Sequence, residues 1–332
     1  MGSELYPILW FLLIGLALMI YIVLDGFTLG LALLFPFIRA EHHRSIIINT
    51  AKPFWDGNQT WLVLAAAGVY GAFPLAYATI LPALYLPLIL MLLCLFCRGI
   101  TFEFRGKAEH TRYHFDRLFQ GSVLIAILAQ GMMLGALIRG IPIQNGHFAG
   151  NALSWFSWFG VFVGVALMIG NALLGAAWLV MKTEGKLQAH GYRLIRPLTL
   201  LLLVAMVGVG IWTPLINSHI AERWFRLPDL LWLWPTPLLI LLLTRSILKS
   251  TRQQREKWLF PQVAVMFLIG LFGLTLSLYP WIVPHSLTIW QAASHRSSQE
   301  FLLIGYLILI PVILIYTLFS YRVFRGKVRE DE

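Results

Sequence analysis

The sequence predicts an all-α integral membrane protein, and three of its features support this fold class. Hydrophobic residues make up 59% of the 332 residues and charged residues only 12%, whereas about a quarter of the residues in a soluble domain are charged. No Lys, Arg, Asp or Glu occurs between Asp56 and Arg98. The basic residues fall into alternate loops, as expected of a chain that crosses a membrane repeatedly.

About nine membrane-spanning helices are expected, because a hydrocarbon core of about 30 Å takes about 20 apolar residues per helix. The expected spans are residues 5–38, 58–75, 77–98, 117–139, 155–181, 195–217, 227–247, 259–280 and 300–323. The uncharged run before Arg98 would be ~60 Å long as one helix, so it must fold back on itself. Pro74 and Pro82, with Gly71 nearby, are expected to mark that turn, because proline interrupts helices.

The distribution of basic residues predicts the orientation of the chain. Of the 25 Lys and Arg, 21 lie in one set of loops and the C-terminal tail. The other set of loops holds Arg139, Arg223, Arg226 and Arg296. Basic loops face the cytoplasm, so we expect a multi-pass protein of the bacterial cytoplasmic membrane with its N-terminus outside and its C-terminus inside. The net charge of +10 mostly reflects this bias and argues against a nucleic-acid partner.

Asp25, in "YIVLDGFTLG", is the one acidic residue well inside an expected span. A carboxylate at that depth is unfavourable unless it has a function or a partner, and proton transfer is the typical function. Counted from the two ends of the first span, Asp25 lies nearer the cytoplasmic side. The structural alternative is a side chain that is satisfied by Arg98 or by a backbone amide.

A second polar cluster lies in "KPFWDGNQTWL", residues 52–62. Asp56 is expected to precede a helix directly, and Gln59 three residues later gives the spacing of a capping box. A helix cap alone does not require Asn58, Gln59 and two tryptophans as well. The functional alternative therefore places Asp56 at the cytoplasmic mouth of a proton route that continues to Asp25.

The sequence predicts no haem, metal or catalytic centre in this chain alone. All nine histidines fall in loops or near the ends of expected spans, whereas haem iron is usually held by His, Met or Cys. Methionines without a histidine partner ordinarily serve packing. Cys94 and Cys97 supply half a metal site at best and are expected to be buried thiols. No Gly-rich phosphate loop or catalytic triad pattern is present.

Four stretches in series resemble subunit II of the cytochrome bd-type quinol oxidases. They are "LDGFTLG" (24–30), "PFWDGNQTWLV" (53–63), "FCRGITFEFR" (96–105) and "YPWIVPHSLTIWQAA" (279–293). The resemblance implies two four-helix bundles plus one peripheral helix. On this chain they would be residues 1–140, residues 141–285, and a peripheral C-terminal helix with a cytoplasmic tail at 286–332.

The resemblance also implies a function within a complex. Subunit II pairs with a subunit I that holds two b-type haems and one d-type haem, oxidises quinol and reduces dioxygen to water. The family's cytoplasmic proton path falls here on Trp55, Asp56 and Asp25, and Asn58 and Gln59 form a supporting polar cluster. The identity of the quinone, a small accessory subunit, and a lipid or quinone in a groove all remain open.

Three positions depart from the family pattern. Thr28 stands where many relatives have Asp, Gly99 where many have Pro, and Gln291 where "WDA" is common. An ionic role is therefore not expected at positions 28 and 291. The competing class is a proton-coupled secondary transporter that uses Asp25, but such carriers tend to show inverted repeats, and the sequence has no convincing one.

Overall fold

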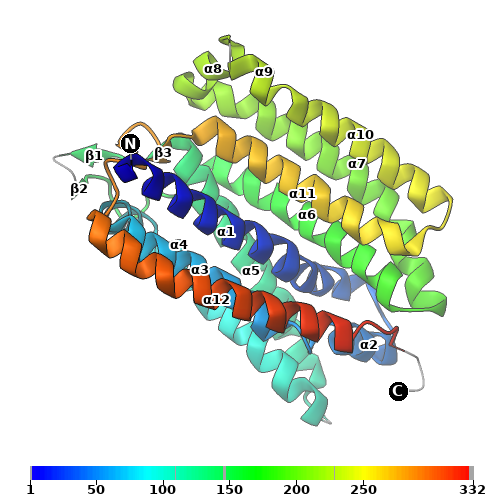
Figure 1. Ribbon diagram of the computed structural model, residues 1–332. Helices are drawn as coiled ribbons and strands as arrows, with labels where there is room; N and C mark the ends of the chain where they lie inside the picture. Colours follow the sequence, from blue (N-terminus) through cyan, green and yellow to red (C-terminus); the bar gives the residue numbers. More distant parts are fainter. Residues whose placement is uncertain (1, 109, 145–146, 228, 329–332) are drawn as a thin grey trace.

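The protein is a bundle of long helices that run in a common direction (Figure 1). The computed structural model describes residues 2–108, 110–144, 147–227 and 229–328. The long helices are α1 (Gly2–Leu34), α3 (Trp55–Ala72), α4 (Pro74–Phe104), α5 (Arg112–Arg139), α6 (Trp158–Lys182), α7 (Gly185–Ile216), α10 (Pro235–Arg252), α11 (Glu256–Leu278) and α12 (Arg296–Val323).

Short elements lie at the ends of the bundle. They are the 3-10 turns η1 (Phe35–Phe37) and η2 (Arg105–Lys107), the helices α2 (Glu41–Ala51), α8 (Ser218–Phe225) and α9 (Asp229–Leu233), and the strands β1 (Ile143–Gln144), β2 (His147–Phe148), β3 (Trp281–Val283) and β4 (Leu287–Thr288). β1 pairs antiparallel with β2, and β3 with β4. In Figure 1 the N-terminus and the small sheets lie at one end, and α2 and the end of α12 lie at the other.

The helices confirm a multi-pass membrane protein. Within the described ranges, eight helical segments are long and apolar enough to cross a bilayer. The ninth expected span corresponds to α3, which has 18 residues and lies close to the expected range of 58–75. α3 is not among the eight, because its first turn carries Asp56, Asn58 and Gln59. The expected count of nine is therefore approximate.

The turn between α3 and α4 is tighter than the sequence suggested. α3 ends at Ala72 and α4 begins at Pro74, so Phe73 alone connects them. Pro74 is the first residue of α4, where its missing N–H removes no helical hydrogen bond. The expectation that Pro82 also marks the turn was wrong, since it lies inside α4 with Pro87. Neighbouring helices in a membrane bundle tolerate such prolines.

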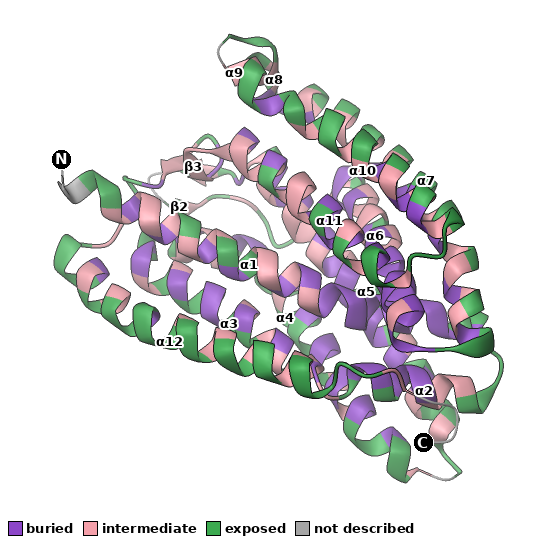
Figure 2. Ribbon diagram, turned by 45° about the vertical axis from the view of Figure 1, so that its right-hand side comes forward, coloured by how far each residue is buried: buried purple, intermediate pink, exposed green. Residues whose placement is uncertain are grey.

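Glycines allow α6 to pack in the centre of the bundle. Gly30 of α1 lies against the backbone of Asn171 and Gly175 of α6, and a Cβ built on Gly30 would lie 1.8 Å from the Asn171 carbonyl oxygen. On the other side of α6, a Cβ on Gly131 of α5 would lie 2.1 Å from the Cα of Gly164. Small residues at both contacts let the backbones approach closely. Figure 2 shows buried residues concentrated in α5 and α6.

α12 lies along the outside of α3 and α1, although it is the last helix in the chain (Figure 1). The Tyr306 hydroxyl donates to the Leu64 carbonyl, and the indole of Trp10 donates to the Gln299 carbonyl at 3.3 Å. Most other α12 side chains are exposed (Figure 2). These contacts attach the C-terminal helix to the N-terminal part of the chain.

The contact between α1 and α6 predicts a strong effect of Gly30→Ala. The added methyl group would overlap the Asn171 backbone, and overpacking of this kind typically costs about 1–3 kcal/mol. We expect a lower unfolding temperature and a lower yield of monodisperse protein in detergent. Gly15→Ala on the same helix is the matched control, because nothing lies within 4 Å of its added Cβ. Equal stability of the two variants would contradict this packing.

Candidate functional site

Asp25 lies inside α1 and is almost fully buried, with 1% of its surface exposed. The glycine that follows explains how α6 covers it. A Cβ on Gly26 would lie 2.9 Å from both the Asn171 Oδ1 and the Leu174 Cδ1, so only glycine lets α6 approach this closely. The carboxylate is therefore held away from solvent.

An ion pair between Asp25 and Arg98 joins α1 to α4. Arg98 Nη1 donates to Asp25 Oδ1 at 2.8 Å, and neither side chain is more than 1% exposed. The structural alternative, in which Arg98 satisfies Asp25, therefore describes the observed contact. Both charges have lost their hydration, so the pair is favourable only while the two side chains keep this close geometry.

Thr28 completes this site and was not identified from the sequence as part of it. Its hydroxyl lies 2.8 Å from Asp25 Oδ1, 2.8 Å from the Asp25 carbonyl oxygen and 3.0 Å from Arg98 Nη1. One turn of helix brings residue 28 back beside residue 25. A neutral hydroxyl thus bonds to both members of the ion pair.

The ion pair leaves several buried polar atoms without a partner. Among the described residues, Asp25 Oδ2 and Arg98 Nε and Nη2 make no hydrogen bond. Buried polar atoms are usually satisfied, and those that are not often belong to functional sites. Asp25 therefore has one carboxylate oxygen that is available to bind a proton or an ordered water.

Asn58 connects the second polar cluster to the Asp25 site. Its Nδ2 donates to the Leu24 carbonyl at 2.7 Å, and its Oδ1 accepts from the Tyr321 hydroxyl at 3.1 Å. Asn58 is 1% exposed. It therefore ties α3 and α12 to the turn of α1 that carries Asp25.

Trp55 covers the helix turn that carries Arg98. Its ring stacks on Phe102 with a centroid distance of 5.8 Å, and a Cβ on Gly99 would lie 3.0 Å from the indole. Glycine at position 99 therefore gives the indole room. Trp55 thus lies between Arg98 and the end of the bundle that carries α2.

Asp56 does not cap α3, so that expectation was wrong. α3 begins at Trp55, and its N-cap residue Phe54 makes no side-chain cap bond. Asp56 is exposed in the first helical turn, where a carboxylate interacts favourably with the helix dipole. Within the part of the chain that the structure describes, neither Asp56 nor Gln59 makes a side-chain hydrogen bond or ion pair. The cluster therefore divides: Asn58 points inward, while Asp56 is exposed and Gln59 half-buried.

Residues 324–328, called the C-terminal strap below, follow α12 and lie at the end of the bundle that carries α2 (Figure 1). Lys182 is 5% exposed and donates to the carbonyls of Phe324 and Gly326. Val328 N donates to the Lys182 carbonyl at 2.9 Å. Lys327 pairs with Glu256 at 2.8 Å. No sequence motif indicated this contact, because it joins residues that are far apart in the chain.

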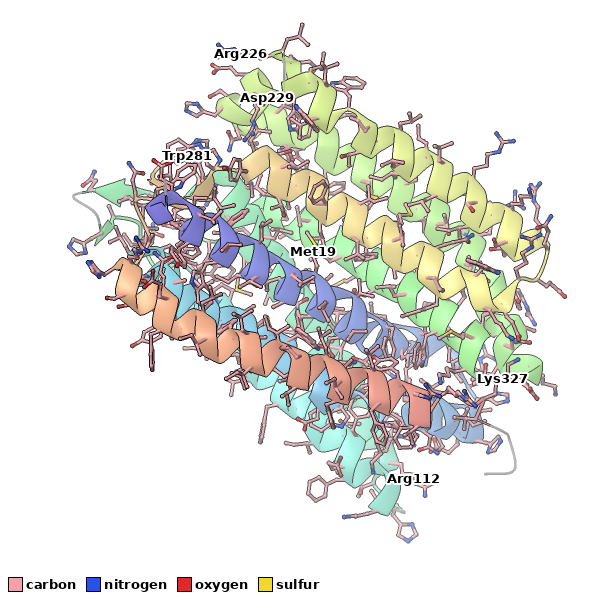
Figure 3. The ribbon with its side chains drawn as sticks, in the orientation of Figure 1. Met19, Arg112, Arg226, Asp229, Trp281 and Lys327 are labelled. Carbon is pink, nitrogen blue, oxygen red and sulfur yellow. The ribbon has the colours of Figure 1, made fainter. Side chains whose placement is uncertain are left out.

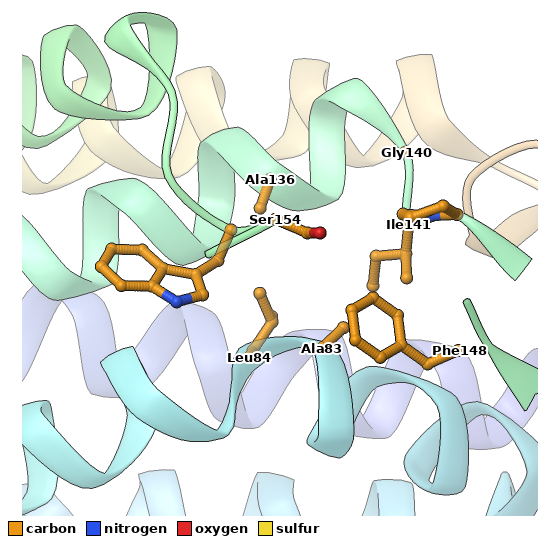
Figure 4. Close-up of a pocket in the computed structure, with 9 residues that line it drawn as sticks. Ala83, Leu84, Ala136, Gly140, Ile141, Phe148 and Ser154 are labelled. Carbon is orange, nitrogen blue, oxygen red and sulfur yellow. The ribbon is translucent and has the colours of Figure 1, made fainter. Parts of the chain in front are cut away.

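The described residues contain no group of three or more His, Cys, Asp or Glu that could hold a metal ion. Cys94 is buried and Cys97 half-buried, and both are free. A small void of about 10 Å³ near the small sheets is lined by residues that include Ala83, Gly140 and Trp155 (Figure 4). It has room for about one water molecule and lies away from Asp25.

Comparison with known proteins identifies the family. The family model described as cytochrome bd terminal oxidase subunit II matches residues 6–324. This chain belongs to that family. Subunit 2 of the cytochrome bd-I ubiquinol oxidase of Escherichia coli (strain K12) is 27% identical, over 99% of this chain and 97% of the relative. Subunit 2 of the cytochrome bd ubiquinol oxidase of Bacillus subtilis (strain 168) is 26% identical, over 98% and 97% respectively.

A solved structure has the same fold. The bd oxidase from Geobacillus thermodenitrificans includes a chain with a TM-score of 0.73 and 18% identity, covering 98% of this chain and 99% of that chain. Subunit II thus belongs to a multi-subunit oxidoreductase, a cytochrome bd quinol oxidase, which implies a partner subunit I. The family assignment disfavours the secondary transporter.

The ion pair predicts that Arg98→Met destabilises the protein strongly. The Asp25 carboxylate would stay buried without its counter-charge, and breaking a buried pair typically costs about 3–5 kcal/mol. The double variant Asp25→Asn/Arg98→Met should recover most of the loss, because no charge is then stranded. The thermal unfolding midpoint of the purified complex measures both effects. Lys249→Met, which removes an exposed cation, is the control. An Arg98→Met variant as stable as this control would refute a structural role for the pair.

Proposed function

We propose that this subunit II supports a haem-bearing subunit I, binds no haem itself, and provides part of the path by which cytoplasmic protons reach the site of oxygen reduction. The proposal rests on Asp25 Oδ2, a buried carboxylate oxygen in a membrane helix that has no hydrogen-bond partner among the described residues. Intramembrane carboxylates typically mark proton relays.

The chemistry assigns a limited task to this chain. Quinol oxidation supplies electrons, and the haems of subunit I would carry them to dioxygen. Each dioxygen that is reduced to two waters also consumes four protons. In subunit II, Asp56 collects protons at the exposed start of α3, and Asp25 Oδ2 accepts a proton further inside. Arg98 balances the charge of the ionised carboxylate. Trp55 packs over the turn of α4 between these two positions and limits free access of water.

The proposed orientation places the C-terminus and α2 in the cytoplasm and the N-terminus outside. Figure 3 shows Arg112 and Lys327 toward one end of the bundle and Arg226, Asp229 and Trp281 toward the other. The 21 basic residues of the proposed cytoplasmic side support this orientation through the positive-inside rule. Asp56 then lies on the side from which protons are drawn.

We also propose the division into two four-helix units, residues 1–140 and 141–285, with residues 286–332 as a peripheral helix and tail. The close contacts of α6 with α1 and α5 would then form the interface between the two units. α12 would be the peripheral helix, which agrees with its largely exposed surface.

Asp25→Asn tests the proposed proton site. Asparagine keeps the volume of the side chain and removes its titration, so we expect oxygen reduction by the complex to fall at least tenfold with subunit assembly and haem content unchanged. The measurements are oxygen uptake with quinol, haem absorption and a subunit gel. Loss of the assembled complex would instead assign Asp25 to structure. Normal turnover in a normal complex would reject the proposal.

Asp56→Asn tests the proposed mouth of the path. The side chain is exposed, so removing its charge should lower turnover several-fold, most clearly at high pH where protons are scarce. Stability should change little, because a charge in the first helical turn is worth only about 0.3–1 kcal/mol. Glu184→Gln removes another exposed carboxylate near the C-terminal strap and serves as the control. If both variants show the same turnover from pH 6 to about pH 9, Asp56 is not the mouth.

A further inference from the structure

Asn217 connects three elements at one end of the bundle and is 3% exposed. It precedes α8, and its Oδ1 accepts from the Ile220 N–H at 3.1 Å, so it caps this helix. Its Nδ2 donates to the carbonyl of Ile138, near the end of α5, at 2.7 Å. The same Nδ2 lies 2.7 Å from His285 Nε2. Because His285 belongs to the turn between β3 and β4, Asn217 joins that turn to α5 and α8.

The two backbone contacts of Asn217 fix which way its amide points. If the amide were turned over, its oxygen would face the Ile138 carbonyl and its NH₂ group would face the Ile220 N–H, so both bonds would be lost. The group that meets His285 is therefore an N–H donor. His285 Nε2 must then accept, which it can do only while it carries no proton. The contact thus requires a neutral imidazole with its proton on Nδ1.

Protonation of His285 removes this contact. Both nitrogens of an imidazolium are donors, so Nε2–H would face the Asn217 donor, while the Asn217 oxygen is already bonded to α8. Partial loss of hydration, and then the nearby His219, lower the pKa of His285 below its ordinary value. A lowered pKa in the folded protein means that the stability from this contact is present above the unfolded-state pKa and is lost as the pH falls through the folded-state pKa.

The charged groups around His285 do not compensate for a positive charge on its ring. His219 of α8 lies with its ring centroid 4.6 Å away, and it becomes positive in the same pH range. At the end of α5, Arg139 bonds to carbonyls of the loop before α6. On α8, Arg223 belongs to an ion pair with α9, and Glu222 is exposed. Among the described residues, no carboxylate forms an ion pair with His285.

The turn that carries His285 depends on contacts to keep its shape. His285 has a φ of 65°, in the left-handed region that residues other than glycine rarely adopt. Its ring packs against the end of α5, where a Cβ on Gly140 would lie 3.1 Å from His285 Cδ2. Unfavourable backbone conformations persist when surrounding contacts hold them. Loss of the bond to Asn217 therefore loosens the turn.

We propose that Asn217 and His285 form an acid-sensitive latch, in which neutral His285 holds the β3–β4 turn against α5 and α8, protonation of Nε2 from solvent releases it, and His219 lowers the pH at which release occurs. The His285 ring is exposed, so protons reach it directly. The latch does not depend on the proposed proton path. In the proposed orientation it lies at the outer end of the bundle and responds to acidity there.

Hydrogen–deuterium exchange in the assembled complex tests the latch. The reporters are the amides of Ser286 and Ile289, which are hydrogen-bonded within the same segment. Their protection, corrected for the intrinsic pH dependence of exchange, should fall about fivefold between about pH 8 and about pH 5, the effect of one ordinary hydrogen bond at a titrating histidine. His285→Phe keeps a flat ring without an acceptor and should show the low protection at both pH values.

His219→Gln removes the neighbouring charge, so the midpoint of the loss should move to higher pH. His147→Gln is the matched control, because it removes another exposed histidine, on β2, and should behave like the unmodified complex. The latch is refuted if protection in the unmodified complex does not change with pH, or if His285→Phe keeps full protection at the higher pH or still responds to acid. An unmoved midpoint in His219→Gln, or an altered response in His147→Gln, also overturns it. These outcomes are independent of the turnover tests on Asp25 and Asp56.

Discussion

The ion pair between Asp25 and Arg98 is the constraint on which the centre of the molecule depends. Both side chains are nearly inaccessible to solvent, and two buried charges remain favourable only when their positions are fixed. The surrounding contacts supply that fixation. Thr28 bonds to both partners, Trp55 packs over the turn that carries Arg98, and Asn58 holds the α1 backbone at Leu24.

Lys182 is another buried charge, and the C-terminal strap stabilises it without an ion pair. Lys182 has no carboxylate within ion-pair distance in the described ranges, so carbonyl dipoles and aromatic rings replace a counter-ion. Its Nζ lies 5.2 Å from the ring centroid of Trp178 and 5.8 Å from that of Phe54, distances suited to a cation–π contact. Phe54 also stacks on Tyr321 with a centroid distance of 4.3 Å, so one aromatic ring contacts both Lys182 and the tyrosine that binds Asn58.

The sequence predicted the helices better than the contacts between them. Apolar length and the alternation of basic loops located the spans, since both depend only on the bilayer, and Asp25 was identified because charges in spans are rare. The start of α3 was misplaced because local cap spacing at Asp56 and Gln59 does not reveal that the helix already begins at Trp55. Tyr321 and Lys182 were missed because their partners are distant in sequence.

The choice of threonine at position 28 follows from the charge balance of the buried site. Arg98 carries one positive charge and Asp25 one negative charge, so the pair is neutral when both are ionised. A carboxylate at position 28 would lie beside Asp25 and add a second negative charge without a second cation, and like charges at such distances disfavour each other strongly. One of the two carboxyl groups would then have to keep a proton. With Thr28, the hydroxyl bonds to both partners without adding charge, so the ion pair keeps one negative and one positive charge.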